Sequence, residues 1–119
     1  MDSSQAAALI TTYISAWNER DRERRRHLLD RLLTEEDTYE DPRGRVVGPQ
    51  AMNEWIHAYR IRFPHLTLRQ GGVVAHHHAV VHYPWETTDA EGHTVHQGRD
   101  FGHVTPDGRL LSIVSFFGR

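Results

Sequence analysis

The chain of 119 residues contains no cysteine and no lysine, and it has no long apolar run. Without cysteine there is no disulfide bond, no thiolate nucleophile and no cysteine-ligated metal. No stretch approaches the roughly 20 apolar residues that a membrane-spanning helix needs. The first ten residues, MDSSQAAALI, lack the basic and apolar regions of a secretory signal. We therefore expect a cytoplasmic protein that does not insert into membranes.

The chain also lacks a strong excess of positive or negative charge. The 14 basic residues, all arginine, nearly balance 16 acidic residues and leave a net charge of −2. Such a chain has no general attraction for nucleic acid, so we expect no nucleic-acid partner. The basic run at residues 22–26 is expected on a solvated helix face. The length fits a single domain over residues 1–119 with a modest core.

Three helices are predicted in the N-terminal half, because apolar residues there recur every three or four positions. Capping signals mark their starts: Ser3 or Ser4 for the first, Asp21 for the second and the pair Gly48-Pro49 for the third. Pro64 ends the third. Their apolar residues are Leu9, Ile10, Tyr13, Ile14 and Trp17, then Leu28, Leu29, Leu32 and Leu33, then Met52, Trp55, Ile56 and Tyr59.

The C-terminal half reads as strands. Four are predicted, at residues 66–74, 76–87, 94–104 and 109–117, and a short fifth lies earlier at 38–41, where Pro42 stops it. Turn residues at 89–92 and 106–108 predict hairpins, so the four strands form a meander. Helices segregated from an antiparallel sheet define an α+β fold.

Five segments carry a resemblance to a known superfamily: TYISAWNERD, TYEDPRG, GPQAMNEW, GRDFGHV and DGRLLSIVSFFG. With them the chain resembles the nuclear transport factor 2-like superfamily, which includes SnoaL-like proteins and ketosteroid isomerases, over residues 5–118. The resemblance implies a cone: a strongly curved antiparallel sheet wrapped around three helices, also called a cystatin-like α+β barrel. It further implies a homodimer that packs through the outer face of the sheet, and an open apolar pocket for a small apolar or polycyclic molecule.

The closest functional pattern is that of ketosteroid isomerase. Asp41 falls where that family keeps its general base, Tyr13 where it keeps the oxyanion-hole tyrosine, and Asp100 where it keeps a protonated, hydrogen-bond-donating aspartic acid. Such a set can move a proton beside a carbonyl, since the base takes the proton and the two donors stabilise the developing negative charge. This chemistry needs no cofactor and no metal.

Strand alternation assigns the neighbours of these acids to faces. Asp100 shares its face with His96, Gly98, Gly102 and Val104, whereas Arg99, Phe101 and His103 point the other way. Glu40 likewise points opposite Asp41. Five residues are expected to bind the substrate: Trp17, Trp55, Tyr59, His96 and Phe116.

The histidines between positions 76 and 103 suggest two further hypotheses. His76 and His78 share a strand face, and His96 could supply a third metal ligand across the hairpin. A native metal is not expected, because strand spacing separates His78 from His82 by about 13 Å. A histidine base in place of Asp41 is the other alternative, with His78, His82 and His96 as candidates.

The leading hypothesis is an isomerase-like enzyme acting by proton transfer. Related alternatives are a polyketide cyclase, a dehydratase, or an epoxide hydrolase, which would need an Asp–Arg–Asp cluster. Arg99 cannot supply that arginine if Asp100 points inward. A third class, a non-catalytic ligand-binding or protein-interaction module, remains open, as does the identity of the substrate.

Overall fold

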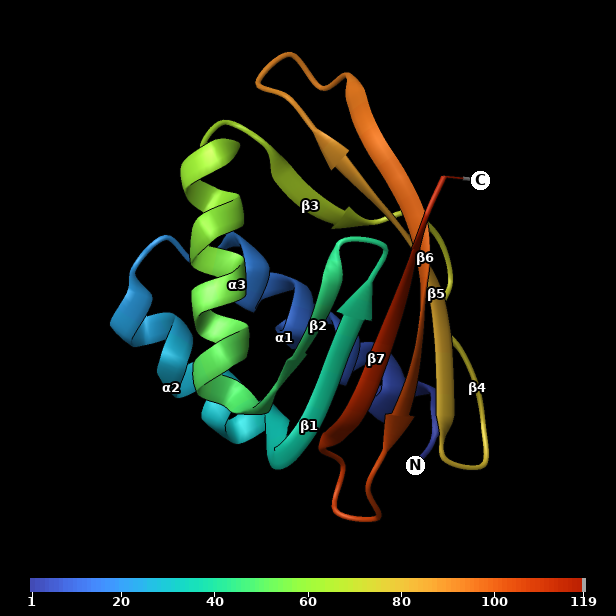
Figure 1. Ribbon diagram of the computed structural model, residues 1–119. Coiled ribbons are helices and arrows are strands. Elements are labelled where there is room, and N and C mark those ends of the chain that lie inside the picture. Colours follow the sequence, from blue (N-terminus) through green and yellow to red (C-terminus); the bar gives the residue numbers. More distant parts are fainter. Residues whose placement is uncertain (119) are drawn as a thin grey trace.

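The computed structural model describes residues 1–118, which form three helices on one face of a curved seven-stranded sheet (Figure 1). The sheet bends around the helices, so the α+β cone expected from the sequence is confirmed. The elements are α1 (Ser3–Asn18), α2 (Arg22–Leu32), β1 (Leu33–Asp41), β2 (Gly44–Val47), α3 (Gly48–Arg62), β3 (Thr67–Gln70), β4 (Ala75–His77), β5 (Val80–Thr88), β6 (Thr94–Val104) and β7 (Leu110–Phe117).

The helix starts follow from local capping. The cap of α1 is Asp2, one residue before the predicted Ser3: Asp2 accepts a hydrogen bond from the Gln5 amide while the Gln5 side chain accepts one from the Asp2 amide, each at 2.8 Å. Asp21 caps α2 as predicted. Leu33 was expected in α2, but it lies in β1.

The sheet runs in the order β2-β1-β7-β6-β5-β3, and β4 pairs with β5. The predicted meander corresponds to the antiparallel pairs β3–β5, β5–β6 and β6–β7. The short predicted strand at residues 38–41 begins earlier, at Leu33, and pairs with β2 in a hairpin that the sequence analysis did not predict. β1 lies parallel to β7, so one pair departs from the antiparallel expectation. This pairing places the β1–β2 turn beside the end of β7.

The core lies between the helices and the concave face of the sheet. Each helix contributes its predicted apolar stripe, and the strands contribute every second residue. The most buried members include Ile10, Leu29, Ile56, Val81 and Ile113. α1 and α3 end at the open end of the cone, so the side chains of their last turns lie close to the sheet edge there.

The prediction that residues 22–26 form a solvated face is wrong for Arg25, which is fully buried. Its guanidinium donates to the Asn53 amide oxygen at 2.6 Å and to the Glu19 carbonyl at 2.8 Å, and it lies 3.1 Å from His57 Nδ1. Arg25 therefore joins the end of α1 to α3 from inside α2. These partners come from other elements, which explains why a local pattern did not identify it.

The outer face of the sheet is free of helices (Figure 1). Phe101, Leu111 and Phe116 lie on it and are 42%, 42% and 56% exposed. Phe101 stacks on His82, with ring centroids 4.4 Å apart, and meets Phe116 edge-on. Among the described helices, none is long and apolar enough to cross a membrane.

Candidate active site

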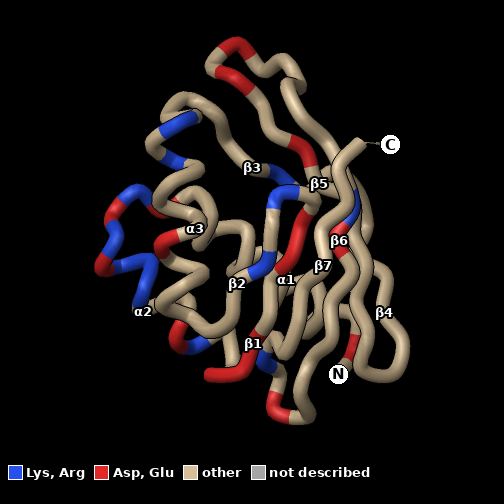
Figure 2. The backbone as a smooth tube through the Cα atoms, viewed as in Figure 1, with Lys and Arg blue, Asp and Glu red and all other residues tan. Residues whose placement is uncertain are grey.

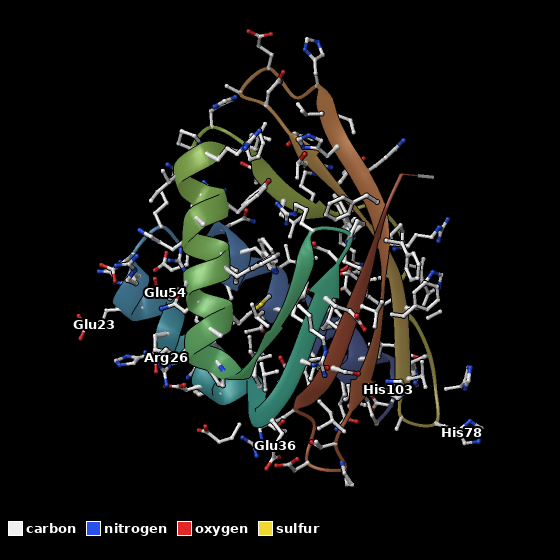
Figure 3. The ribbon with its side chains drawn as sticks, in the orientation of Figure 1. Glu23, Arg26, Glu36, Glu54, His78 and His103 are labelled. Carbon is white, nitrogen blue, oxygen red and sulfur yellow. The ribbon has the colours of Figure 1, made fainter. Side chains whose placement is uncertain are left out.

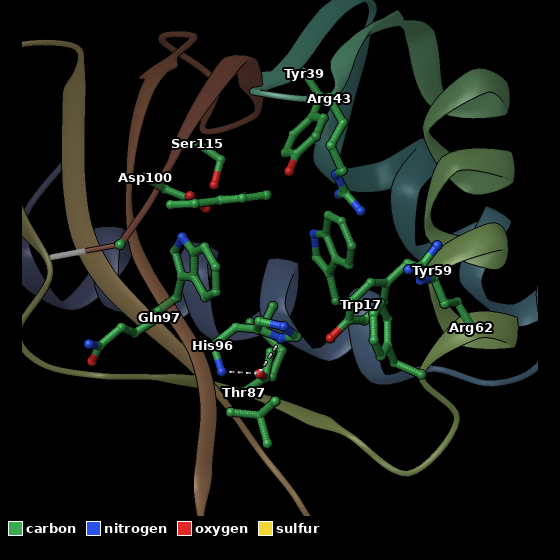
Figure 4. Close-up of a pocket in the computed structure, with 16 residues that line it drawn as sticks. Trp17, Tyr39, Arg43, Tyr59, Arg62, Thr87, His96, Gln97, Asp100 and Ser115 are labelled. Atoms are coloured by element: carbon green, nitrogen blue, oxygen red, sulfur yellow. Dashed lines mark hydrogen bonds between the residues drawn. The ribbon is translucent and has the colours of Figure 1, made fainter.

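A cavity of about 590 Å³ opens at the wide end of the cone, between the helices and the sheet (Figure 4). The helices contribute Trp17 and Tyr59 on one side, and the sheet contributes Asp100 and Ser115 on the other. The lining residues are Trp17, Tyr39, Arg43, Tyr59, Arg62, Phe63, Leu68, Trp85, Thr87, Val95, His96, Gln97, Asp100, Ser115, Phe117 and Gly118. The wall thus combines six aromatic residues with seven polar or charged ones, a mixture suited to a small molecule that has both an apolar body and polar groups.

The aromatic wall is built by mutual packing. Trp17, in the last turn of α1, meets Tyr59 of α3 edge-on at 5.4 Å and Tyr39 of β1 at 5.8 Å between ring centroids. Asn18, the next residue, holds β3 in place: its side chain donates to the Leu68 carbonyl at 2.8 Å and accepts from the Leu68 amide at 2.9 Å. Helix ends therefore position both the aromatic wall and the strand that borders it.

Asp100 is the only carboxyl group that lines the cavity among the described residues, and it is 6% exposed. Its Oδ2 accepts a hydrogen bond of 2.7 Å from the Tyr83 hydroxyl, whereas its buried Oδ1 has no partner in residues 1–118. Burial raises the pKa of Asp100 to about 6, although the Tyr83 hydroxyl and the nearby donors of Ser115 and Trp85, which form no hydrogen bond of good geometry with it, act to lower it. A free carboxylate oxygen with a pKa near neutrality is suited to exchanging a proton at physiological pH.

Asp41 lies near the cavity but is fully engaged. Oδ1 accepts from the Arg43 amide at 2.8 Å, and Oδ2 accepts from the Tyr39 hydroxyl at 2.9 Å and from Arg43 Nη2 at 2.8 Å. Its side chain is inaccessible to solvent. Burial alone would raise the pKa of Asp41, but the hydrogen bonds from Arg43 and Tyr39 outweigh it and lower the pKa. In this arrangement Asp41 is a weak base with no free lone pair aimed at the cavity.

Arg43 separates Asp41 from the cavity. Its guanidinium lies between the rings of Trp55 and Phe117, 5.4 Å from each centroid. Trp55, expected to bind substrate, is thus placed behind Arg43, where it also packs near Tyr39 at 6.2 Å. It does not line the cavity.

Tyr13 lies one helical turn before Trp17 and is buried in the core, with 1% exposure. It is not among the cavity-lining residues. Its hydroxyl has no hydrogen-bond partner in the described chain. Burial, reinforced by the charge of Asp100, raises the pKa of Tyr13 well above 10, so the group remains a protonated donor.

The expectation that Phe116 binds substrate is not met by its position. Phe116 lies opposite Arg99 in the β6–β7 register and points outward, as its exposure shows. Ser115, which pairs with Asp100, and Phe117 line the cavity instead. Alternation along β7 accounts for this arrangement, because the residues on either side of an outward Phe116 must point inward.

The three histidines considered as possible metal ligands do not come together. His76 lies 3.1 Å from the Ser3 hydroxyl, His78 points away from the body of the protein (Figure 3), and His96 contacts Thr87 at 3.3 Å. Of the three candidate bases, only His96 lines the cavity, because His78 is exposed and His82 stacks on the outer face.

Of the sixteen residues that line the cavity, twelve were not among the site residues predicted from the sequence, and Tyr39, Arg43, Trp85 and Ser115 are four of these. Alternation could have identified Tyr39, which shares a strand face with Asp41, and Ser115. Trp85 lies so close to Gly98 that a Cβ on Gly98 would be 2.4 Å from the indole. The glycine is therefore required there, but the sequence alone does not show which side chain it accommodates. Nothing local identifies Arg43, since its place depends on the β1–β7 pairing.

Comparison with known proteins identifies relatives of this architecture. The family model of the SnoaL-like domain matches residues 10–113. A proposed isomerase of the SnoaL-like family from Agrobacterium tumefaciens str. C58 is 31% identical, with a TM-score of 0.92 over 98% of this chain and 99% of that one. A SnoaL-like protein of unknown function from Burkholderia thailandensis E264 is 16% identical, with a TM-score of 0.77 over 100% and 99% of the two chains, and shows the fold alone. No curated protein matches the sequence.

Proposed function

The chain belongs to the SnoaL-like family, and from that premise we propose that it is a cofactor-independent enzyme that moves a proton next to a carbonyl group of a small molecule. The outcome would be a double-bond isomerisation or a related cyclisation or dehydration. The observation that carries the proposal is the buried Asp100, which lines the cavity and has one carboxylate oxygen, Oδ1, without a hydrogen-bond partner in residues 1–118.

We assign the proton-transferring role to Asp100 rather than to Asp41. A general base needs a free lone pair and a pKa near the working pH. Asp100 has both, whereas the carboxylate of Asp41 is occupied by Arg43 and Tyr39. The role of general base, which the resemblance to ketosteroid isomerase implies for Asp41, is thereby moved to Asp100.

Two donors in the cavity wall support stabilisation of the oxyanion. The Tyr59 hydroxyl and the Trp85 indole N–H are buried side-chain donors of cavity-lining residues, and neither completes a hydrogen bond of good geometry in residues 1–118, although Trp85 lies close enough to Asp100 to lower its pKa. A substrate oxygen that becomes negative would meet unpaired donors there. Tyr13, with its equally unpaired hydroxyl, is a third candidate if the substrate reaches deeper than the cavity wall.

The proposal is tested first without a substrate. We expect carboxyl carbon NMR of the folded protein to give Asp100 a pKa of about 6, and an ordinary value near 4 would contradict the assignment. A panel of β,γ-unsaturated ketones, including steroids, then tests turnover through the absorbance of the conjugated product.

The pH profile separates the two possible roles of Asp100. If it is the base, kcat/KM rises with pH through about 6 and then levels, because only the ionised form accepts a proton. If it is a protonated donor, kcat/KM falls over the same range. Asp100→Asn should reduce turnover roughly 100-fold or more, and Asp41→Asn should retain most of it; the reverse order would restore Asp41 as the base.

A second candidate is the activation of water, as in an epoxide hydrolase. Arg43 beside Asp41 supplies the arginine that Arg99 cannot, since Arg99 points to the outer face. Asp100 forms no ion pair with Arg43, however, so only two of the three groups of an Asp–Arg–Asp cluster are paired in the described chain. Hydrolysis of an epoxide panel in preference to enone isomerisation would favour this candidate. The cavity and the raised pKa of Asp100 count against a purely non-catalytic module.

The proposal includes a homodimer formed through the outer face of the sheet. Phe101 and Phe116 are apolar, exposed and in contact, Leu111 is an exposed apolar residue farther along β7, and no described helix covers them. Burying such a cluster against a second copy would remove it from water.

A further inference from the structure

Two arginines line the cavity, although the chain as a whole is weakly acidic. Arg43 stands on the β1–β2 turn and Arg62 in the last turn of α3. Figure 2 marks basic residues at both places, at the same end of the molecule, and Figure 4 shows both side chains at the cavity. The only acid in the described cavity wall, Asp100, is buried at the sheet side.

Arg62 has no anionic partner. It forms no ion pair and no hydrogen bond with residues 1–118, and its guanidinium lies over the Phe63 ring at 5.4 Å. A guanidinium offers five N–H donors in a planar fork that matches a carboxylate. All five of these donors are therefore open to a ligand.

Arg43 retains donor capacity as well. It uses Nε and Nη2 on Asp41, and Nη1 makes no hydrogen bond to a described residue. The stacking of its guanidinium between Trp55 and Phe117 holds this free edge in place without a further protein partner. Its side chain is 45% exposed, so an anion can approach it.

From these observations we propose that the natural ligand is an amphipathic acid: an aromatic or polycyclic body carrying a carboxylate, which Arg62 and the free edge of Arg43 bind at the cavity mouth. The aromatic wall accommodates the body, and the arginines bind the anion. This rests on the proposed function in one respect, since it places the reacting end of the ligand at Asp100.

The charges also orient such a ligand. An ionised Asp100 repels a carboxylate, whereas Arg62 and Arg43 attract it, so the acid group stays at the mouth and the uncharged end enters. A neutral ligand of the same shape would not be oriented by these charges. Recognition of an acid group would therefore select both the substrate and the direction in which it binds.

A matched pair of probes tests the inference at equilibrium. We expect isothermal titration calorimetry at pH 7.5 and low salt to show 2-naphthoate binding about tenfold more tightly than 2-naphthamide, which has the same ring system without the charge. The preference should shrink in 0.5 M NaCl, because salt screens partly exposed ion pairs.

Two variants with equal charge changes locate the effect. Arg62→Gln should abolish most of the preference for naphthoate over naphthamide. Arg45→Gln, on an exposed residue of β2 outside the cavity wall, should preserve the preference. Equal affinities for the two probes, equal losses in the two variants, or no binding of either probe would each overturn the inference.

These measurements need no turnover, so they fail or succeed independently of the proposed reaction. If Asp100→Asn left catalysis intact but naphthoate remained preferred, the assigned base would be wrong and the acid-binding mouth would stand. If the preference were absent while Asp100→Asn abolished turnover, the reaction would stand and the ligand class would be wrong.

Discussion

Asp41 and Arg43 form a two-point ion pair across the β1–β2 turn, with Nη2 2.8 Å from Oδ2 and Nε 3.3 Å from Oδ1. The residues are two positions apart, and Pro42 lies between them. The pair explains why a conspicuous acid at a strand end is unsuited to act as a base in the free protein. Its charge already serves to hold an arginine at the mouth of the cavity.

Removing that charge should cost stability. We expect Asp41→Asn to lower the free energy of unfolding at pH 7 by roughly 1–2 kcal/mol, since Arg43 and Tyr39 both lose a charged acceptor. Because the pKa of Asp41 is lowered by folding, its contribution is present above the unfolded-state value near 4 and is lost as pH falls through the lower folded value. Urea denaturation at pH 7 and pH 3 checks this. The exposed neighbour Glu40→Gln is the control, and equal behaviour of the two variants would contradict the expectation.

Asp37 should act in the opposite sense. It lies on β1 with 2% exposure and an unpaired Oδ1, and burial raises its pKa to about 7. The unfolded chain therefore ionises first, and stability falls as pH rises from about 4 to 7. Asp37→Asn should remove this loss and stabilise the protein above pH 7 by roughly 1–3 kcal/mol.

Thermal unfolding of the Asp37 variant at pH 5 and pH 8 provides the measurement. Glu36→Gln, on the exposed side of β1, should keep the pH dependence of the parent protein. Asp100, whose pKa is also raised, should leave a smaller slope of the same sign in Asp37→Asn. A slope unchanged from that of the parent protein would show that Asp37 is solvated or paired.

Arg25 tests the buried contacts among the helices. Arg25→Met keeps much of the volume but leaves the Asn53 amide oxygen and the Glu19 carbonyl without their donor. We expect a loss of about 2–4 kcal/mol in the free energy of unfolding. Arg24→Met, on the exposed side of the same helix, should change it by less than about 0.5 kcal/mol. Similar small changes in both variants would mean that the buried network contributes little.

The outer face of the sheet should govern assembly. We expect light scattering after size exclusion to give the parent protein twice the mass of one chain. The double variant Phe101→Ser/Phe116→Ser should be monomeric, because it removes the largest exposed apolar groups of that face. Val73→Ser, at a residue that is 84% exposed in the segment between β3 and β4, is the control for general surface polarity. A monomeric parent protein, or a double variant that remains dimeric, would rule out this interface.

Local patterns in the sequence determined much of this protein. The periodicity of Leu9 to Trp17 and the cap at Asp21 predict two helices, and the alternation around Asp100 predicts which β6 residues face inward. These features depend on interactions between residues that are close in the sequence, so the sequence alone is enough to predict them. The same alternation applied to β7 would have replaced Phe116 with Phe117.

The tertiary structure decided the rest. The parallel pairing of β1 with β7 brings Arg43 against Phe117, and the packing of three helices buries Arg25 beside Asn53. Tertiary contacts also move the pKa values of Asp41 and Asp100 in opposite directions. The pKa of Asp41 is lowered by hydrogen bonds from Arg43 and Tyr39, whereas that of Asp100 is raised by burial, with one carboxylate oxygen unpaired. Desolvation and ion pairing depend on which distant segments surround a group, and no spacing along the chain specifies those neighbours.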